Sequence, residues 1–119
     1  MSISRPLAQA TLRPMVLAIL RNGPGYGYRI IKRIHDLTDG EIEWTTGTLY
    51  PFLHGLENEG VLRSYWEKAD EGPRRKYYSL TPAGERALES ESAQWERVYG
   101  LLSKLFAPPA HGSEALIPG

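Results

Sequence analysis

Residues 61–82 read VLRSYWEKADEGPRRKYYSLTP, and this stretch decides the fold. The aromatic and β-branched residues that favour β-strands recur in 61–68 and 74–81. The five residues between these runs contain a Gly-Pro pair and form a turn of hairpin length. A Thr-Pro pair at 81–82 then supplies the N-cap and first residue of a helix. The stretch therefore predicts a β-hairpin that leads directly into a helix.

Two helices are predicted near the start of the chain. Residues 8–21 are apolar nearly all round, which is typical of a buried helix. Because proline is tolerated only in a first turn, Pro14 should start the well-formed part near Arg13 or kink the helix. A glycine-rich turn at 22–25 follows, and residues 26–37 form the second helix. The apolar residues at helical spacing on one face of that helix are Tyr28, Ile31, Ile34 and Leu37.

The third helix carries a core face and a polar face. It should begin with Thr45 or Thr46 as N-cap and end at Gly60. The apolar stripe has i, i+3, i+4, i+7 spacing and consists of Leu49, Phe52, Leu53 and Leu56. The outward face carries groups that can reach base edges and phosphates from a major groove, namely Thr46, Thr48, Tyr50, Pro51, His54 and Asn58. Taken alone, this helix face fits a solvated polar surface better than it fits a DNA-binding surface.

The hairpin adds three consecutive cations, Arg74, Arg75 and Lys76, near the end of a thin projection. Such a projection beside a helix-turn-helix is well placed to hold the phosphates that flank a groove. The alternative is that these cations only keep a sheet edge soluble. The predicted order is helix, helix, helix, hairpin, long helix, which matches a mainly α winged helix-turn-helix with a small β-hairpin. Because both elements occur in this order, the pattern favours binding to double-stranded DNA.

The charge balance supports a competing interpretation. The 119 residues include 14 basic and 14 acidic side chains, whereas DNA-binding domains are usually basic. Residues 1–80 carry 11 basic and 9 acidic side chains, so the basic excess of this part is small. A winged-helix module that binds protein instead of DNA is therefore the alternative function.

Enzymatic and metal chemistry have no predicted site. There is no cysteine, no phosphate-binding glycine loop, and no metal-binding spacing among His35, His54 and His111. We expect no catalytic residue, no cofactor and no metal. No apolar run reaches the ~20 residues of a membrane span, and residues 1–9 lack the apolar stretch of a signal peptide. The expected compartment is the cytoplasm, without a membrane partner.

The last predicted helix, residues 82–106, carries an apolar seam. The seam has heptad spacing, interrupted at Glu91, and consists of Leu88, Trp95, Val98, Leu102 and Leu105. It packs either against the first helix of the same chain or against a second copy. Because palindromic DNA sites match two-fold symmetry, we expect a homodimer. Trp95 is either an anchor of this interface or an aromatic wall for a flat ligand, and residues 107–119 are expected to form a disordered tail.

Four segments of the sequence resemble the PadR family of transcriptional regulators. They are YGY at 26–28, GTLYPFL at 47–53, LENEGVL at 56–62 and GPRRKYYSLT at 72–81. The resemblance covers residues 8–106 and implies a homodimeric repressor with a winged helix-turn-helix in 1–81 and a dimerisation helix in 82–106. The short last helix is similar to the small subfamily.

Two further segments, SYW at 64–66 and WERV at 95–98, resemble the multidrug-responsive branch of this family. In that branch a tryptophan from each subunit sandwiches flat aromatic drugs at the dimer centre. The resemblance implies that Trp95 holds a planar aromatic effector, with Arg13, Leu17 and Tyr99 around it. Tyr99 stands where the drug binders have an acid, and Arg13 lies nearby, so anionic or neutral aromatics are expected rather than cations.

Overall fold

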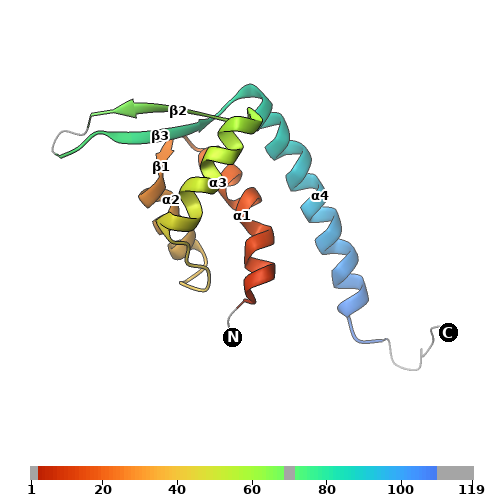
Figure 1. The fold of residues 1–119 in the computed structure, drawn as a ribbon. Coiled ribbons are helices and arrows are strands. Elements are labelled where there is room, and N and C mark those ends of the chain that lie inside the picture. The colour runs from red at the N-terminus through yellow and green to blue at the C-terminus, as the bar shows by residue number, and fades with distance from the viewer. Residues whose placement is uncertain (1–2, 69–71, 110–119) are drawn as a thin grey trace.

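The computed structural model describes residues 3–68 and 72–109 and has the predicted architecture (Figure 1). Its elements are α1 (Arg5–Leu20), β1 (Gly25–Tyr26), α2 (Gly27–Leu37), α3 (Thr46–Glu59), β2 (Leu62–Glu67), β3 (Arg75–Leu80) and α4 (Pro82–Phe106). The β2–β3 hairpin, hereafter the wing, projects to one side of the helices, and α4 leaves them on the other. The predicted mainly α winged helix with a long last helix is confirmed. Residues 69–71 of the predicted turn and 110–119 of the predicted tail lie outside the described residues.

The sheet has one more strand than the hairpin. Its order is β1-β3-β2, and both pairings are antiparallel. β1 is only two residues long and lies within the segment that sequence spacing assigned to a turn and the start of a helix. Gly25 pairs with Tyr78, and Tyr26 pairs with Tyr77. The pairing ties the N-terminus of α2 to the wing.

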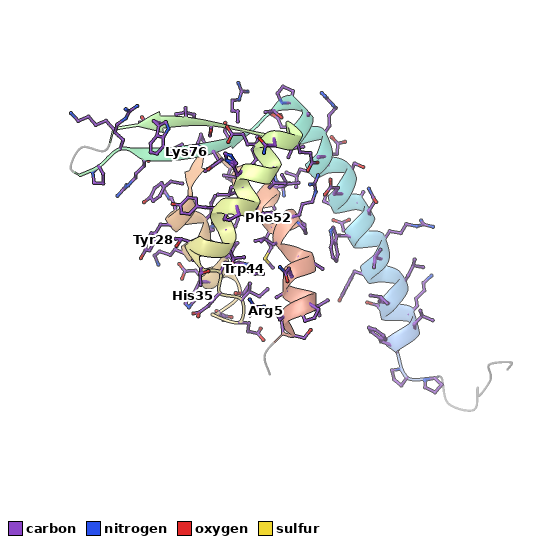
Figure 2. All side chains as sticks on the ribbon, in the orientation of Figure 1. Arg5, Tyr28, His35, Trp44, Phe52 and Lys76 are labelled. Carbon is purple, nitrogen blue, oxygen red and sulfur yellow. The ribbon has the colours of Figure 1, made fainter. Side chains whose placement is uncertain are left out.

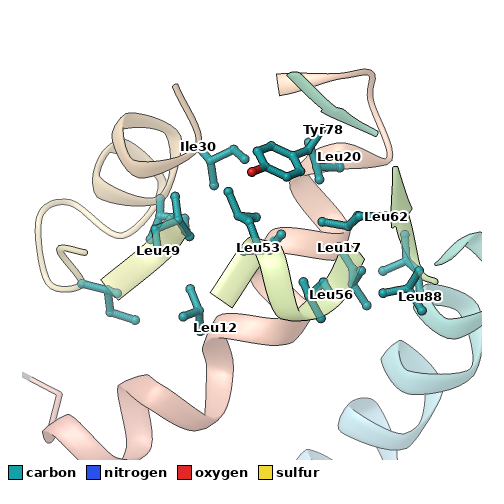
Figure 3. Packing of buried hydrophobic residues seen from close by; sticks show 14 residues of the cluster. Leu12, Leu17, Leu20, Ile30, Leu49, Leu53, Leu56, Leu62, Tyr78 and Leu88 are labelled. Carbon is teal, nitrogen blue, oxygen red and sulfur yellow. The ribbon is translucent and has the colours of Figure 1, made fainter. Parts of the chain in front are cut away.

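The core lies between the first three helices and the base of the wing (Figure 3). Val16, Leu17, Leu49 and Leu53 are each 0% exposed. All three buried leucines of α3, at 49, 53 and 56, belong to its predicted apolar stripe, and Phe52 is half-buried against the core.

The buried face of α2 differs from the predicted one. Ile30 and Ile34 are 1% exposed, whereas Tyr28 and Leu37 are 65% and 62% exposed. Gly27, Ile30 and Ile34 follow an equally regular i, i+3, i+7 spacing. The position of α1 and α3 decides between the two faces, and local spacing does not contain that information.

Helix α1 begins at Arg5, earlier than predicted, and continues through Pro14 without a break. Pro6 occupies the first turn, where its missing N–H is harmless. Pro14 removes the hydrogen bond to the carbonyl of Ala10, and Ala10 is exposed. The helix therefore tolerates the proline with one backbone hydrogen bond fewer.

The ends of α3 and the start of α4 follow the predicted signals. The side chain of Thr45 accepts from the N–H of Thr48, and Gly60 ends α3 with a left-handed φ of 89°. Thr81 Oγ1 accepts from the N–H of Gly84 at 3.0 Å and donates to the carbonyl of Gly60 at 2.6 Å. One side chain therefore joins the end of α3 to the start of α4.

Candidate nucleic-acid interface

A cleft of about 500 Å³ separates α3 from the wing. It is lined by Tyr26, Tyr50, Pro51, His54, Trp66, Arg74, Arg75, Lys76 and Tyr78. Six of these are residues that the sequence singles out for DNA contact, three from α3 and three from the wing. The fold thus brings members of both predicted groups to one surface, whereas Thr46 and Thr48 of α3 do not line this cleft.

The three wing cations each lie over an aromatic ring. Arg75 is 4.5 Å from the centroid of Tyr26, and Arg74 is 5.9 Å from that of Trp66. Both arginines remain exposed, so their guanidinium groups are held on the rings and still open to solvent.

Lys76 differs from these two arginines. It is half-buried 5.5 Å from the ring centroid of Tyr78, and its Nζ lies 3.8 Å from Glu57 Oε1. Figure 2 shows Lys76 beside α3 and not at the end of the wing. Its charge is therefore partly balanced within the protein.

Glu57 joins α3 to both wing strands, a role that the sequence does not reveal. Its carboxylate accepts a short hydrogen bond from the Ser64 hydroxyl of β2 and faces Lys76 of β3. The Nδ1 atom of His54 lies 3.9 Å from the same carboxylate. Glu57 thus fixes the position of the wing relative to α3.

A tyrosine ladder covers the outward face of the sheet. The rings of Tyr65 and Tyr77 stack at 5.8 Å with 11° between their planes. Tyr26 meets Tyr77 edge-on at 5.4 Å. Each strand contributes one ring, so the ladder adds side-chain packing to the backbone pairing that holds the wing.

The outward face of α3 contains free and partly engaged residues. Thr46, Pro51 and His54 are exposed. Tyr50 is 42% exposed, and its ring lies on Gly27, where an added Cβ would approach its Cζ to 2.6 Å. The hydroxyl of Thr48 lies 3.4 Å from Thr45 Oγ1 at the helix N-terminus, and its side chain is half-buried. Tyr50 therefore packs α3 against α2, and Thr48 takes part in the N-terminus of α3.

Tyr26, Trp66 and Tyr78 also line the cleft, and the sequence pattern does not predict this position for them. Trp66 lies opposite Lys76 in the hairpin, and Tyr78 lies two residues further on the same face. Strand alternation is thus the signal for both, but it requires the hairpin register, which the five-residue turn does not determine. Tyr26 enters through β1, for which the sequence shows no strand periodicity.

The residues predicted to hold an aromatic effector occupy different environments. Leu17 is 0% exposed in the core, so in this chain its side chain does not face solvent. Trp95 and Tyr99 are 39% and 73% exposed on α4. Arg13 makes four hydrogen bonds to Glu59 and Glu91, so its guanidinium is already occupied.

The electrostatics at Arg13 follow from this arrangement. Hydrogen bonds from Arg13 hold the pKa of the Glu59 carboxyl below its ordinary value. Glu59 first, and then Glu91, raise the pKa of the guanidinium. The family resemblance implies an effector near Arg13, whereas in the structure the partners of Arg13 are two carboxylates of the same chain.

The predicted interface seam divides into two parts. Leu88 is 7% exposed and packs in the core of its own chain, so this position of the seam already has a partner within the chain. The other seam residues are 39% to 78% exposed, and they are Trp95, Val98, Leu102 and Leu105. From residue 93 to 106 every position of α4 is exposed.

Within the described ranges, 3–68 and 72–109, no three His, Asp or Glu side chains are grouped so that they could hold a metal ion. No described helix is both long and apolar enough to span a bilayer.

Comparisons with known proteins agree with this geometry. The transcriptional regulator YqjI of Escherichia coli is 32% identical in a match that covers 73% of this chain and 40% of that protein. A transcriptional regulator of Mycobacterium tuberculosis is 35% identical over 55% of this chain and 73% of its own length.

Solved structures extend the likeness to the fold. A transcriptional regulator from Clostridium thermocellum superposes with a TM-score of 0.76 at 28% identity, covering 86% of this chain and 99% of that one. A PadR family transcriptional regulator from Eggerthella lenta has a TM-score of 0.71 at 38% identity, covering 84% and 85%.

The family model described as "Transcriptional regulator PadR-like family" matches residues 16–90, which is more than half of the chain. Regulators of this family bind DNA and are generally not enzymes. The chain therefore belongs to the PadR-like family of transcriptional regulators.

Proposed function

We propose that two copies of this chain bind one palindromic operator and repress transcription, with each α3 in a major groove and each wing on the flanking phosphates. The observation that carries the proposal is the cleft between α3 and the wing. Its lining combines α3 side chains that can contact base edges with wing side chains that can contact phosphates. His54 and Thr46 are exposed on α3 and offer hydrogen-bonding groups to base edges. Arg74 and Arg75 offer guanidinium groups to phosphates.

The aromatic rings beneath the arginines support this assignment. A flexible arginine loses side-chain entropy when it binds phosphate. Arg75 over Tyr26 and Arg74 over Trp66 are already restricted before DNA arrives. We therefore expect the wing to bind phosphates with little further ordering.

The outer part of α4 supports the proposed homodimer. Its seam residues Trp95 and Leu102 remain 39% and 41% exposed, and Leu105 is 78% exposed. Contiguous apolar patches of this kind mark interaction sites. Heptad spacing suits a second helix, and a palindromic operator requires two-fold symmetry, so a second copy is the proposed partner.

A planar aromatic effector that releases the operator is the finer part of the proposal. If two copies of α4 cross near Trp95, the two-fold axis places the indoles opposite each other. Arg13 does not take part, because Glu59 and Glu91 occupy it. Trp95 and Tyr99 are the residues proposed to contact the effector.

A salt titration of duplex binding tests the proposal and separates it from a protein-binding winged helix. Each phosphate contact contributes a slope of about −0.9 in a plot of log K against log salt. Arg75→Ala should weaken binding to all duplexes about equally and make the slope shallower by about one unit.

Arg97→Ala is the matched control, because Arg97 is an exposed arginine on the outer part of α4. It should leave the slope unchanged. A slope that is insensitive to Arg75→Ala, or binding lost for one operator alone, would show that the wing does not contact phosphate. A protein-binding module would show no salt-dependent duplex binding at all.

A further inference from the structure

Arg13 of α1 lies between two carboxylates from two other helices. Its Nη1 and Nη2 donate to the two carboxylate oxygens of Glu59, each at 2.8 Å. Its Nε and Nη2 donate to those of Glu91 at 2.7 and 2.9 Å. One guanidinium thus makes a bidentate contact with each acid, 46 and 78 residues away along the chain.

The two acids lie at the end of α3 and at the last partly buried turn of α4. Glu59 is the last residue of α3, the helix proposed to enter the major groove. Glu91 and Ser92 are the last partly buried residues of α4, and all later positions of the helix are exposed. Arg13 therefore joins the end of α3 to the point where α4 leaves the body of the protein.

The chemistry of this contact favours a fixed angle. A bidentate guanidinium–carboxylate pair constrains direction as well as distance, because both groups are planar. The side chains of Arg13 and Glu91 are 30% and 27% exposed, so water only partly competes. Without Arg13, two carboxylates would face each other unpaired.

We propose that Arg13 is a positioning residue that sets the angle between α3 and α4, and thereby the half-site spacing that the dimer reads. The inference rests on the proposed function, since it requires a dimer that binds through α3. Arg13 touches no DNA in this scheme and acts only through Glu59 and Glu91.

The length of α4 makes a small angle matter. Residues 92–106 extend about 22 Å beyond Glu91 at a helical rise of about 1.5 Å per residue. A tilt of about 10° at Glu91 displaces the end of a helix of this length by about 4 Å. Neighbouring base pairs are about 3.4 Å apart along the duplex. Loss of the angle is therefore sufficient to change the spacing between recognition helices by about one base pair.

The test measures binding to duplexes that carry two half-sites at spacings varied one base pair at a time. The half-site is first selected from a random duplex library with the wild-type protein. Wild type should prefer one spacing over its neighbours by about tenfold, within the range usual for coupled equilibria. In Arg13→Met, which keeps the apolar stem, that preference should fall to within about threefold.

Three readouts should stay unchanged in Arg13→Met if the role is positional: the salt slope, the dimer dissociation constant and the far-ultraviolet circular dichroism. Arg13→Lys should restore only part of the preference, because an ammonium cannot make two coplanar bidentate contacts. Arg21→Met is the control. Arg21 is an exposed arginine just after α1, and its substitution should preserve the wild-type spacing profile.

Glu91→Gln is a second variant that weakens only the α4 side of the contact. Flattened spacing profiles in both Arg13→Met and Glu91→Gln support the proposal, and if Arg13→Met does not fold, Glu91→Gln alone decides. If either variant is folded and dimeric and still prefers one half-site spacing as strongly as the wild type does, the proposal is overturned. A wild type that binds no duplex refutes the proposed function itself, whereas tight wild-type binding at every spacing refutes only the role of Arg13.

Discussion

The two halves of α4 follow one heptad pattern but meet different surroundings. In the first half Leu88 is 7% exposed, and Glu91 is paired with Arg13. In the second half Trp95 and Leu102 have the same spacing but are 39% and 41% exposed. A heptad pattern thus indicates that a helix has a partner, without indicating whether the partner belongs to the same chain. The first half of the seam packs against its own chain, and the apolar side chains of the second half are exposed and available to a partner.

The largest expected effect comes from a charge in the second half. Leu102→Asp should convert the proposed dimer to folded monomers, because an aspartate at the seam would bury an unpaired charge in the proposed interface. Leu102 is not part of the core cluster, so the winged domain itself should remain intact. Operator binding should fall below detection, since a single half-site supplies only part of the affinity. Light scattering and duplex binding measure the two effects.

Ser103→Asp is the control for that charge, since Ser103 is the next residue along the same exposed helix but lies off the seam. It should remain dimeric and bind DNA. A Leu102→Asp protein that stays dimeric at micromolar concentration, or a wild type that is a monomer there, would contradict the assignment of the second half to a partner chain.

Truncation at matched positions sharpens the comparison between the halves. Leu88→Ala should lower the free energy of unfolding by about 2–5 kcal/mol, as expected for a buried leucine. That loss should be the same at every protein concentration. Leu102→Ala should act through association instead, so that its effect on Tm depends on concentration. Thermal melts across a hundredfold dilution series distinguish the two variants. If the effect on Tm depended on concentration equally in Leu88→Ala and Leu102→Ala, the two halves of α4 would be equivalent.

The sequence predicts well what local chemistry determines. Helix α3 begins after Thr45 and ends at Gly60, because a hydroxyl cap and a left-handed glycine act within a few residues. Thr81 starts α4 for the same reason. The polar face of α3 follows from helical periodicity and the wing cations from their consecutive positions, and the fold places members of both groups in one cleft.

The sequence does not predict what depends on distant partners. β1 is too short for any periodicity, and its pairing partners lie in β3. The buried face of α2 is decided by its neighbours, so Ile30 and not Tyr28 enters the core. Arg13 pairs with acids 46 and 78 residues away, and only the assembled fold brings them together.

The two glycines near opposite ends of α4 should respond to alanine with opposite signs. A Cβ at Gly84 would collide with the carbonyl of Val61, so Gly84→Ala should destabilise the fold by about 1–3 kcal/mol. A Cβ at Gly100 meets no atom within 4 Å, and Gly100 lies away from the seam. Gly100→Ala should stabilise by about 0.5–1 kcal/mol through helix propensity. Urea unfolding measures the change in the free energy of unfolding for both variants. If the two changes had the same sign, the two halves of α4 would not differ in this respect.

The smallest expected effect concerns a ligand in the second half of α4. If the indoles of two Trp95 residues face each other across the two-fold axis, they can stack on both sides of one flat aromatic molecule. Each stacked pair contributes about 0.5–1.5 kcal/mol beyond the area buried. Together with burial this is sufficient for dissociation constants on the order of micromolar. In the competing arrangement Tyr99, which is 73% exposed one turn later, fills the gap and the indoles pack on each other.

Titration of a planar aromatic dye, followed through the dye's own fluorescence, distinguishes these arrangements without interference from Trp44 and Trp66. We expect saturable binding of about one dye per dimer, the stoichiometry that a single site on the two-fold axis requires. Trp95→Ala should abolish binding while light scattering still shows a dimer. Trp66→Phe is the control, because Trp66 lines the other aromatic cleft, beside α3. A dye that binds Trp95→Ala but not Trp66→Phe would place the ligand in the DNA-facing cleft and leave Trp95 as an interface residue only.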